Sequence, residues 1–189
     1  MARVSDVGPD KVPADVRGTY LEFASGYGSF RNQVGVLAHV PSAVRHLMRM
    51  LLELREQENV PHRYVELAIV VVSKLNECRY CVAHHQPRLI AAGLSASGVD
   101  RILDYADHPE LDAVDRLVVE YAIAVTLAPQ RIRDGVFERL RRHFTEAQIV
   151  ELTLRIALCG FFNRVNDALQ IEVEAETPAD IQVTGASRR

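Results

Sequence analysis

The sequence contains no tryptophan, and aromatic residues make up only 6% of its 189 residues. The core is therefore expected to consist mainly of Leu, Val, Ile and Ala, a composition that suits packed helices. No apolar run approaches the ~20 residues needed to cross a bilayer, and residues 1–13 lack the apolar core of a secretory signal. The formal net charge of −3 argues against the clustered basic face of a nucleic-acid-binding protein. These absences predict a cytoplasmic protein without a membrane or nucleic-acid partner.

Length and composition are those of an ordinary globular domain. The chain is 48% hydrophobic and 25% charged, and its length suffices for a full-sized core. No stretch rich in Gly, Ser or Pro marks an internal boundary, so a single domain over residues 1–189 is predicted. Residues 1–14, which include Pro9 and Pro13, are predicted to form an extended arm.

Apolar residues recur at helical spacing along the rest of the chain. Pro41 and Pro61 each suit the first turn of a helix, because proline lacks the N–H group that has no partner there. Gly93 is predicted to end a helix in a left-handed conformation, and Thr145 with Gln148 fits a capping box before the last helix. Helices are predicted over residues 15–24, 41–54, 61–75, 78–93, 95–104, 114–125, 131–143 and 146–173.

The middle of the helix predicted over residues 61–75 is apolar on every side. Its residues 67–72 include three consecutive valines, which could also belong to a strand. The flanking pattern and the length of the segment favour a helix, and its composition places it in the core. The sequence as a whole predicts an all-α fold, a compact bundle of about eight helices.

Two of the three cysteines lie at C-x-x-C spacing, Cys78 and Cys81, and His85 follows four residues later. Only the thiolate form of cysteine is a strong nucleophile, and an unperturbed thiol with a pKa of ~8.5 is mostly protonated at neutral pH. Both cysteines are predicted in the first turn of a helix, whose N-terminus favours negative charge. At ~100° per residue both cysteines and His85 can share one helix face, whereas His84 is rotated away from it.

Glu66 lies on the preceding predicted helix, twelve residues before Cys78. Asn76 and Glu77 suit a turn, after which the next helix would fold back and bring Glu66 toward the cysteine pair. A carboxylate at this position could accept a proton through water or hold His85 in one tautomer. The pattern therefore predicts an attacking thiol, a resolving thiol, an imidazole that shuttles the proton, and a final proton acceptor.

These residues could instead form a structural zinc site, or the two cysteines could be buried thiols without a chemical role. Zinc is disfavoured because His84 and His85 are adjacent, and four ligands on one short helix cannot converge tetrahedrally. Haem attachment requires a histidine directly after the second cysteine, where Val82 stands. Cys159 lies in an apolar segment and is predicted to be a core residue. No metal and no cofactor are expected.

The spacing of Glu66, Cys78, Cys81 and His85 resembles the alkylhydroperoxidase D (AhpD-like) branch of the carboxymuconolactone decarboxylase family. The resemblance is strongest over residues 41–93 and extends more loosely to residues 152–174. It implies an all-helical fold that assembles as a homo-oligomer, either a dimer, a trimer or a hexamer. It also implies reduction of hydroperoxides through a thiol–disulfide cycle, with the four residues in the relay and redox positions. Tyr80 departs from the pattern, since some members have histidine there.

The leading interpretation is a cytoplasmic thiol peroxidase with a hydroperoxide substrate. One cysteine is oxidised to sulfenic acid, the other condenses with it to a disulfide, and an external dithiol or protein reductant restores the pair. The helix start favours Cys78 as the more acidic thiol, whereas the one-turn spacing from His85 and the resemblance favour Cys81 as the attacking one; Cys81 is preferred. The alternatives are a carboxymuconolactone decarboxylase-like lyase, with His85 and Glu66 as acid and base, and a redox-sensing or metal-binding helical module.

Overall fold

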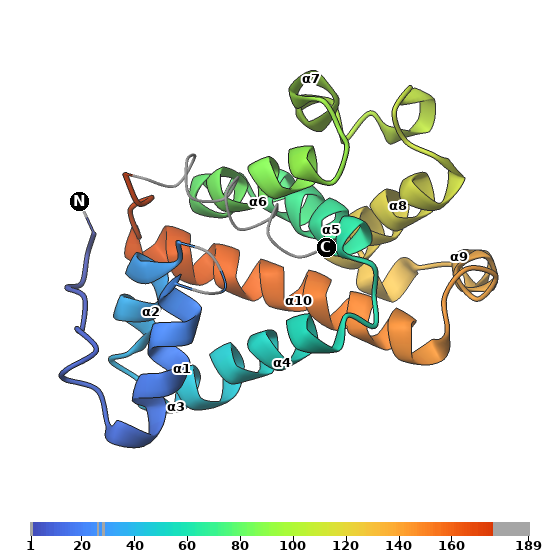
Figure 1. Cartoon of the computed structure of the whole chain (residues 1–189). Coiled ribbons are helices and arrows are strands. Elements are labelled where there is room, and N and C mark those ends of the chain that lie inside the picture. The colour runs from blue at the N-terminus through green and yellow to red at the C-terminus, as the bar shows by residue number, and fades with distance from the viewer. Residues whose placement is uncertain (1, 26, 28, 176–189) are drawn as a thin grey trace. The chain divides into compact units, whose positions relative to one another are not determined.

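The computed structural model of the protein describes residues 2–25, 27 and 29–175 (Figure 1). Over these residues the chain forms helices and no strand, which confirms the all-α prediction. The chain divides into two compact units, Met1–Glu58 with Val165–Arg189, and Asn59–Arg164. The single domain over residues 1–189 stays a prediction.

The first unit contains α1 (Ala14–Ser25), α2 (Arg31–Leu37) and one continuous helical segment over residues 41–57. This segment begins as α3 (Pro41–Ala43), passes through a π-helical turn (Val44–Met48) and ends as α4 (Arg49–Gln57). Pro41 stands at its first turn, as predicted. The chain before α1 is held by backbone hydrogen bonds from Val7 to Gly35 and from Arg3 to Leu169.

The second unit is built around α5 (His62–Leu75). Its central residues, 65–73, are all buried, and the helix packs against both α6 (Arg79–Ala91) and α8 (Ala113–Leu127). The three consecutive valines therefore belong to a helix, as the length and flanking pattern predicted. The remaining helices are α7 (Ala96–Asp100), α9 (Asp134–Leu140) and the long α10 (Glu146–Leu169), of which residues 146–164 belong to this unit.

Local hydrogen bonding decides where several helices begin and end. Thr145 and Gln148 form the predicted capping box before α10, with backbone-to-side-chain distances of 2.9 and 3.3 Å. The predicted end of this helix near residue 173 is wrong, because Gln170 adopts a left-handed φ of 54° and the Ile171 N–H bonds back to the Asn166 carbonyl. The predicted helix over residues 131–143 is also shorter, because a 3₁₀ turn (Pro129–Arg131) precedes α9.

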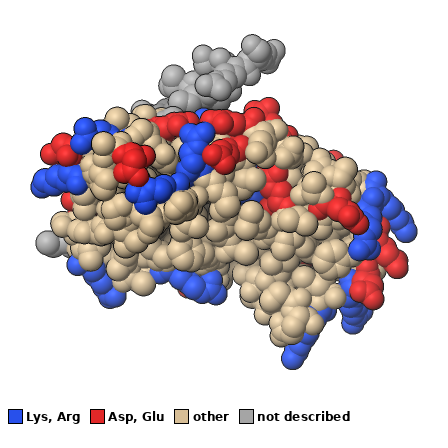
Figure 2. All heavy atoms as spheres, turned by 90° about the horizontal axis from the view of Figure 1, so that it is seen from below, with Lys and Arg blue, Asp and Glu red and all other residues tan. Residues whose placement is uncertain are grey.

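The surface shows where apolar and charged side chains remain. On the face in Figure 2, Lys and Arg side chains lie beside Asp and Glu side chains and form no continuous basic surface. The apolar middle of α5 is buried and contributes nothing to this surface. Val150 and Phe161 on α10 are the exposed apolar side chains of that helix, at 66% and 43% exposure. Among the described residues, none of the helices combines the length and apolar composition needed to cross a membrane.

Arg63 ties three helices of the second unit together. Its guanidinium on α5 donates two hydrogen bonds to the Asp115 carboxylate on α8, at 2.9 and 2.7 Å, and a third to the Ala92 carbonyl at the end of α6, at 2.7 Å. Asp115 is almost fully buried. A buried carboxylate that loses its cationic partner keeps its desolvation cost, so this pair is needed for stability.

We expect Arg63→Ala to lower the free energy of unfolding by about 3 kcal/mol, because it leaves the Asp115 carboxylate buried and uncompensated. Arg139→Ala is the matched control, since it removes a pair with Glu120 whose members are partly exposed, and it should cost less than about 1 kcal/mol. Denaturant unfolding of both variants measures the difference. Equal losses in the two variants would show that the Arg63 pair has no special role.

Candidate active site

Cys78 lies at the junction of two helices, and its backbone is fixed by both. At the end of α5, Glu77 adopts a left-handed φ of 56° and donates its N–H to the Lys74 carbonyl, while the Cys78 N–H bonds to the Ser73 carbonyl at 2.9 Å. This pair of bonds is a Schellman motif. The Cys78 carbonyl in turn accepts the Val82 N–H at 3.0 Å, so Cys78 is also the N-cap residue of α6.

The expectation that both cysteines lie in the first turn of a helix is therefore half correct. Cys81 is the third residue of α6, but Cys78 has an extended backbone and precedes the helix. Cys78 still lies beside the N-terminus of α6, where exposed backbone N–H groups favour negative charge. Cys81 and His85 are four residues apart within α6, so their side chains lie on the same face.

Glu66 meets His85 from the neighbouring helix. The His85 Nδ1 atom lies 2.8 Å from Oε2 of Glu66, and both side chains are buried, at 7% and 2% exposure. An ionised carboxylate can only accept a hydrogen bond, so Nδ1–H of His85 donates it. In a neutral imidazole this bond leaves Nε2 as the proton-accepting atom. The structure thus brings Glu66 to the motif from α5, as the sequence indicated.

The other oxygen of Glu66 faces two further basic side chains, Arg88 and His62. Oε1 lies 3.8 Å from the Arg88 guanidinium and 3.7 Å from Nε2 of His62, an exposed side chain one turn earlier on α5. Burial alone would raise the pKa of Glu66, but His85, Arg88 and His62 outweigh it and lower this pKa to about 2. A carboxyl group with that pKa is a poor proton acceptor. Of the two roles considered for Glu66, the geometry favours holding His85 in one tautomer.

His85 is neutral at neutral pH. Burial lowers the pKa of its imidazole and outweighs the Glu66 carboxylate, which raises it; the positive charge of Arg88 lowers it further. A neutral ring with its proton on Nδ1 can take a proton at Nε2, as the general base of a thiol requires. The groups around Glu66 thus keep its carboxylate charged, whereas burial keeps His85 neutral, so a carboxylate and an uncharged base lie side by side.

His84 and Cys159 belong to the core. The His84 ring stacks on Tyr80 with a centroid distance of 4.3 Å, and its Nδ1 lies 2.8 Å from the Tyr80 carbonyl. Helical geometry put His84 off the face of His85, and its full burial fits that placement. The Cys159 thiol lies 3.4 Å from the Ser73 hydroxyl, and burial chiefly raises its pKa to about 12. It is therefore protonated and a weak nucleophile.

Comparison with known proteins finds a family model and solved structures to which this chain is similar. Residues 41–106 match the model of the carboxymuconolactone decarboxylase family. The alkylhydroperoxidase AhpD core structure of an uncharacterized peroxidase-related protein from Ralstonia eutropha JMP134 superposes with a TM-score of 0.80, at 23% identity, over 94% of this chain and 95% of that one. A protein of unknown function from Agrobacterium tumefaciens is 25% identical over 75% of this chain and 97% of its own, with a TM-score of 0.65. These findings make residues 41–106 similar to the carboxymuconolactone decarboxylase family, and the solved structures share the helical fold.

Other proteins similar to this chain have more varied descriptions. The uncharacterized protein YnjA of Escherichia coli K12 is 24% identical over 87% of this chain and 91% of its own length. The debrominase Bmp8, solved as a variant in complex with 2,3,4-tribromopyrrole, is 18% identical over 97% of this chain and 98% of its own, with a TM-score of 0.73. At that identity the likeness shows the AhpD-like fold alone.

Sequence reasoning missed two residues of this site, Arg88 and His62. Both could have been found from helical spacing, because Arg88 follows His85 by three residues on α6 and His62 precedes Glu66 by four on α5.

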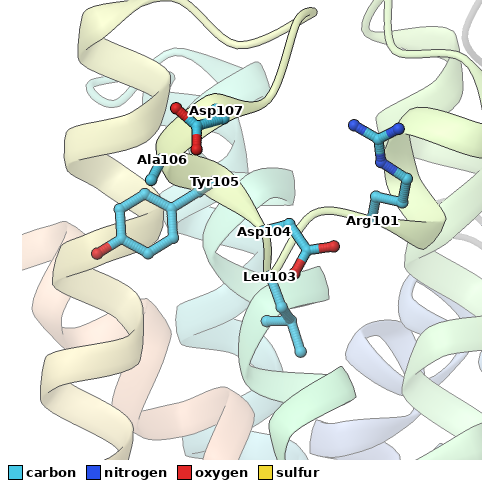
Figure 3. A pocket seen from close by; sticks show the side chains of 6 residues that line it. All are labelled: Arg101, Leu103, Asp104, Tyr105, Ala106 and Asp107. Carbon is cyan, nitrogen blue, oxygen red and sulfur yellow. The ribbon is translucent and has the colours of Figure 1, made fainter.

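A hollow on the second unit, shown in Figure 3, is formed by the segment that connects α7 to α8 and contains none of the predicted redox residues. It is lined by Arg101, Leu103, Asp104, Tyr105, Ala106 and Asp107. Within the described ranges no three His, Cys, Asp or Glu side chains gather as a metal site.

The lowered pKa of Glu66 predicts a distinct acid sensitivity. Its fall from 4.5 to about 2 corresponds to about 3 kcal/mol of stability. This contribution is complete above pH 4.5 and is lost as the pH falls toward 2, because the unfolded chain then binds the proton more readily. We expect Glu66→Gln to lack this part of the pH dependence. Denaturant unfolding at pH 5 and pH 3 tests it, and parallel losses in wild type and variant would contradict it.

Proposed function

We propose that this protein is a thiol-dependent peroxidase of the alkylhydroperoxidase type. The proposal rests on the buried 2.8 Å bond between Glu66 and His85, which holds a neutral imidazole one helical turn from Cys81. The family and the AhpD-like fold support a peroxidase-related or carboxymuconolactone decarboxylase-like function in general. Of these two functions, the C-x-x-C pair beside an imidazole base favours the peroxidase, because its chemistry uses thiols.

The cycle begins with proton transfer from the Cys81 thiol to Nε2 of His85. The thiolate attacks one oxygen of the hydroperoxide, the O–O bond breaks, and the leaving alkoxide takes the proton back from His85 as the alcohol. Cys81 is then a sulfenic acid. The Cys78 thiol attacks this sulfur, forms the disulfide and releases water. An external dithiol or protein reductant exchanges with the disulfide and becomes oxidised, which restores both thiols.

The geometry favours Cys81 as the attacking residue. It shares a face of α6 with His85 at a spacing of four residues, whereas Cys78 precedes the helix at the N-cap. Cys78 lies beside the N-terminus of α6, where backbone N–H groups favour negative charge, and this position suits a resolving thiol that must be nucleophilic without its own base. Both cysteines are nearly fully buried, so a small substrate must reach them through local opening.

Two alternatives remain as outcomes of the same experiments. A lyase of the decarboxylase type would use His85 and Glu66 as acid and base and would tolerate alkylation of both cysteines. A redox-sensing module would form the disulfide without catalytic turnover.

We also propose that the protein is a cytoplasmic homo-oligomer, with the exposed Val150 and Phe161 on α10 as candidate contacts between copies. Sedimentation as a monomer at micromolar concentration would contradict this proposal.

We expect peroxide to link Cys78 to Cys81 and to leave Cys159 reduced. Trypsin cleaves after Arg79, so the disulfide joins the peptides of residues 75–79 and 80–88, while Cys159 lies in the separate peptide of residues 156–164. Mass spectrometry after mild peroxide treatment detects the linked pair. In the same assay with a dithiol donor, Cys81→Ser should abolish peroxide consumption and Cys159→Ser should leave it unchanged. Consumption that persists in Cys81→Ser would overturn the proposed function.

The relay is tested by His85→Ala, for which we expect peroxide reduction to slow by ~10²–10⁴-fold, the usual contribution of a general base. Glu66→Gln should act in the same direction but less strongly, because Gln can still accept the bond from Nδ1–H. His84→Ala is the control on the same helix, and its ring contacts Tyr80 instead of Glu66. Turnover is measured against pH in all three variants. A damaging His84→Ala with a silent His85→Ala would refute this site.

A further inference from the structure

A cluster of polar side chains is buried behind the turn that joins α5 to α6. Asn163 on α10 is fully buried, as is Ser73 near the end of α5. The Asn163 amide accepts a hydrogen bond from the Asn76 side chain at 2.9 Å and donates one to the Ser73 hydroxyl at 3.5 Å. Its Nδ2 also lies 3.7 Å from the sulfur of Cys159. A buried polar group is costly unless it is satisfied, and Asn163 is satisfied mainly by residues of this turn.

These bonds hold the two residues that determine where Cys78 lies. Asn76 is the C-cap residue of α5, two positions before Cys78. Ser73 provides the carbonyl that accepts the Cys78 N–H at 2.9 Å. One side chain on α10 therefore contacts both the first residue and the C-cap residue of the Schellman motif that leads into the C-x-x-C pair.

The turn needs such support, because its conformation is unfavourable in itself. Glu77 has a left-handed φ of 56°, which residues other than glycine adopt reluctantly because the Cβ atom crowds the following carbonyl. Such a conformation persists where its surroundings hold it in place. Helix α10 also approaches closely here: a Cβ atom added to Gly160 would lie 4.0 Å from the Asn76 amide and 3.2 Å from the Arg164 guanidinium.

We propose that Asn163 is a positioning residue for the redox pair, which holds Cys78 at the N-terminus of α6 by fixing Asn76 and Ser73. The inference rests on the proposed thiol function, in which Cys78 must be a competent nucleophile. Without Asn163 the turn relaxes, and the Cys78 sulfur moves away from the helix N-terminus that favours its thiolate form. The ionisable groups around the pair include His84, His85 and Arg88 on α6, Glu66 on α5 and Cys159 on α10.

The test is the pH dependence of iodoacetamide alkylation of the reduced full-length protein. Because trypsin separates the three cysteines, mass spectrometry follows Cys78 by itself. Asn163→Leu and Asn76→Ala both remove the 2.9 Å bond and leave the surrounding ionisable groups unchanged. Each should move the alkylation midpoint of Cys78 up by about one pH unit, a tenfold loss of thiolate at a fixed pH below the midpoint. The double variant should shift no further than either single one.

Tyr121→Phe is the matched control, because it removes a 2.6 Å bond between α8 and Thr153 on α10 that does not involve the turn. It should lower thermal stability and leave the Cys78 midpoint unchanged. A similar midpoint for Asn163→Leu, Asn76→Ala and the wild type would overturn the proposal, whatever their stability. If Asn163→Leu fails to fold, Asn76→Ala decides by itself, since Asn76 is partly exposed. The measurement uses no peroxide, so an inactive wild type would refute the peroxidase proposal without deciding this one.

Discussion

A carboxylate buried in a protein core has to be paired, because the cost of removing it from water is several kcal/mol. Glu66 satisfies this requirement with one bond to His85, with the nearby charge of Arg88 and with the imidazole of His62. The bond joins α5 to α6, so the same interaction that stabilises the carboxylate also fixes the imidazole. The rest of the site depends on this pair, because the bond to Glu66 occupies Nδ1 and makes Nε2 the nitrogen that can take the proton of a thiol.

The helices around Glu66 and His85 stabilise different parts of the site. The apolar middle of α5 anchors Glu66 against α6 and α8, and Arg63 connects these three helices at their ends. The Schellman motif after α5 reverses the chain within a few residues, which makes Cys78 both the end of one helix and the cap of the next. Polar groups from α10 reach this turn from a distant part of the chain. The redox pair is thus supported by backbone bonds on one side and by a buried amide on the other.

Periodicity was sufficient to predict the features that depend on one or two neighbouring helices. The helical character of the valine-rich segment, the shared face of Cys81 and His85, and the approach of Glu66 from the preceding helix all follow from 3.6 residues per turn. The N-cap position of Cys78 does not, because it depends on the left-handed conformation of Glu77, for which glycine or asparagine would have been the usual signal. The bond between Asn76 and Asn163 joins residues 87 positions apart, and no local pattern encodes it.

The protonation state of His85 is the central claim of this account, and nitrogen NMR of its imidazole tests it most directly. Long-range proton–nitrogen correlation spectra at pH 7, assigned by comparison with His85→Gln, distinguish the two ring nitrogens and their protons. The account predicts a neutral ring with the proton on Nδ1 and an unprotonated Nε2. An imidazolium ring, or a neutral ring with its proton on Nε2, would contradict it, because in both forms Nε2 already carries a proton and cannot take that of the thiol.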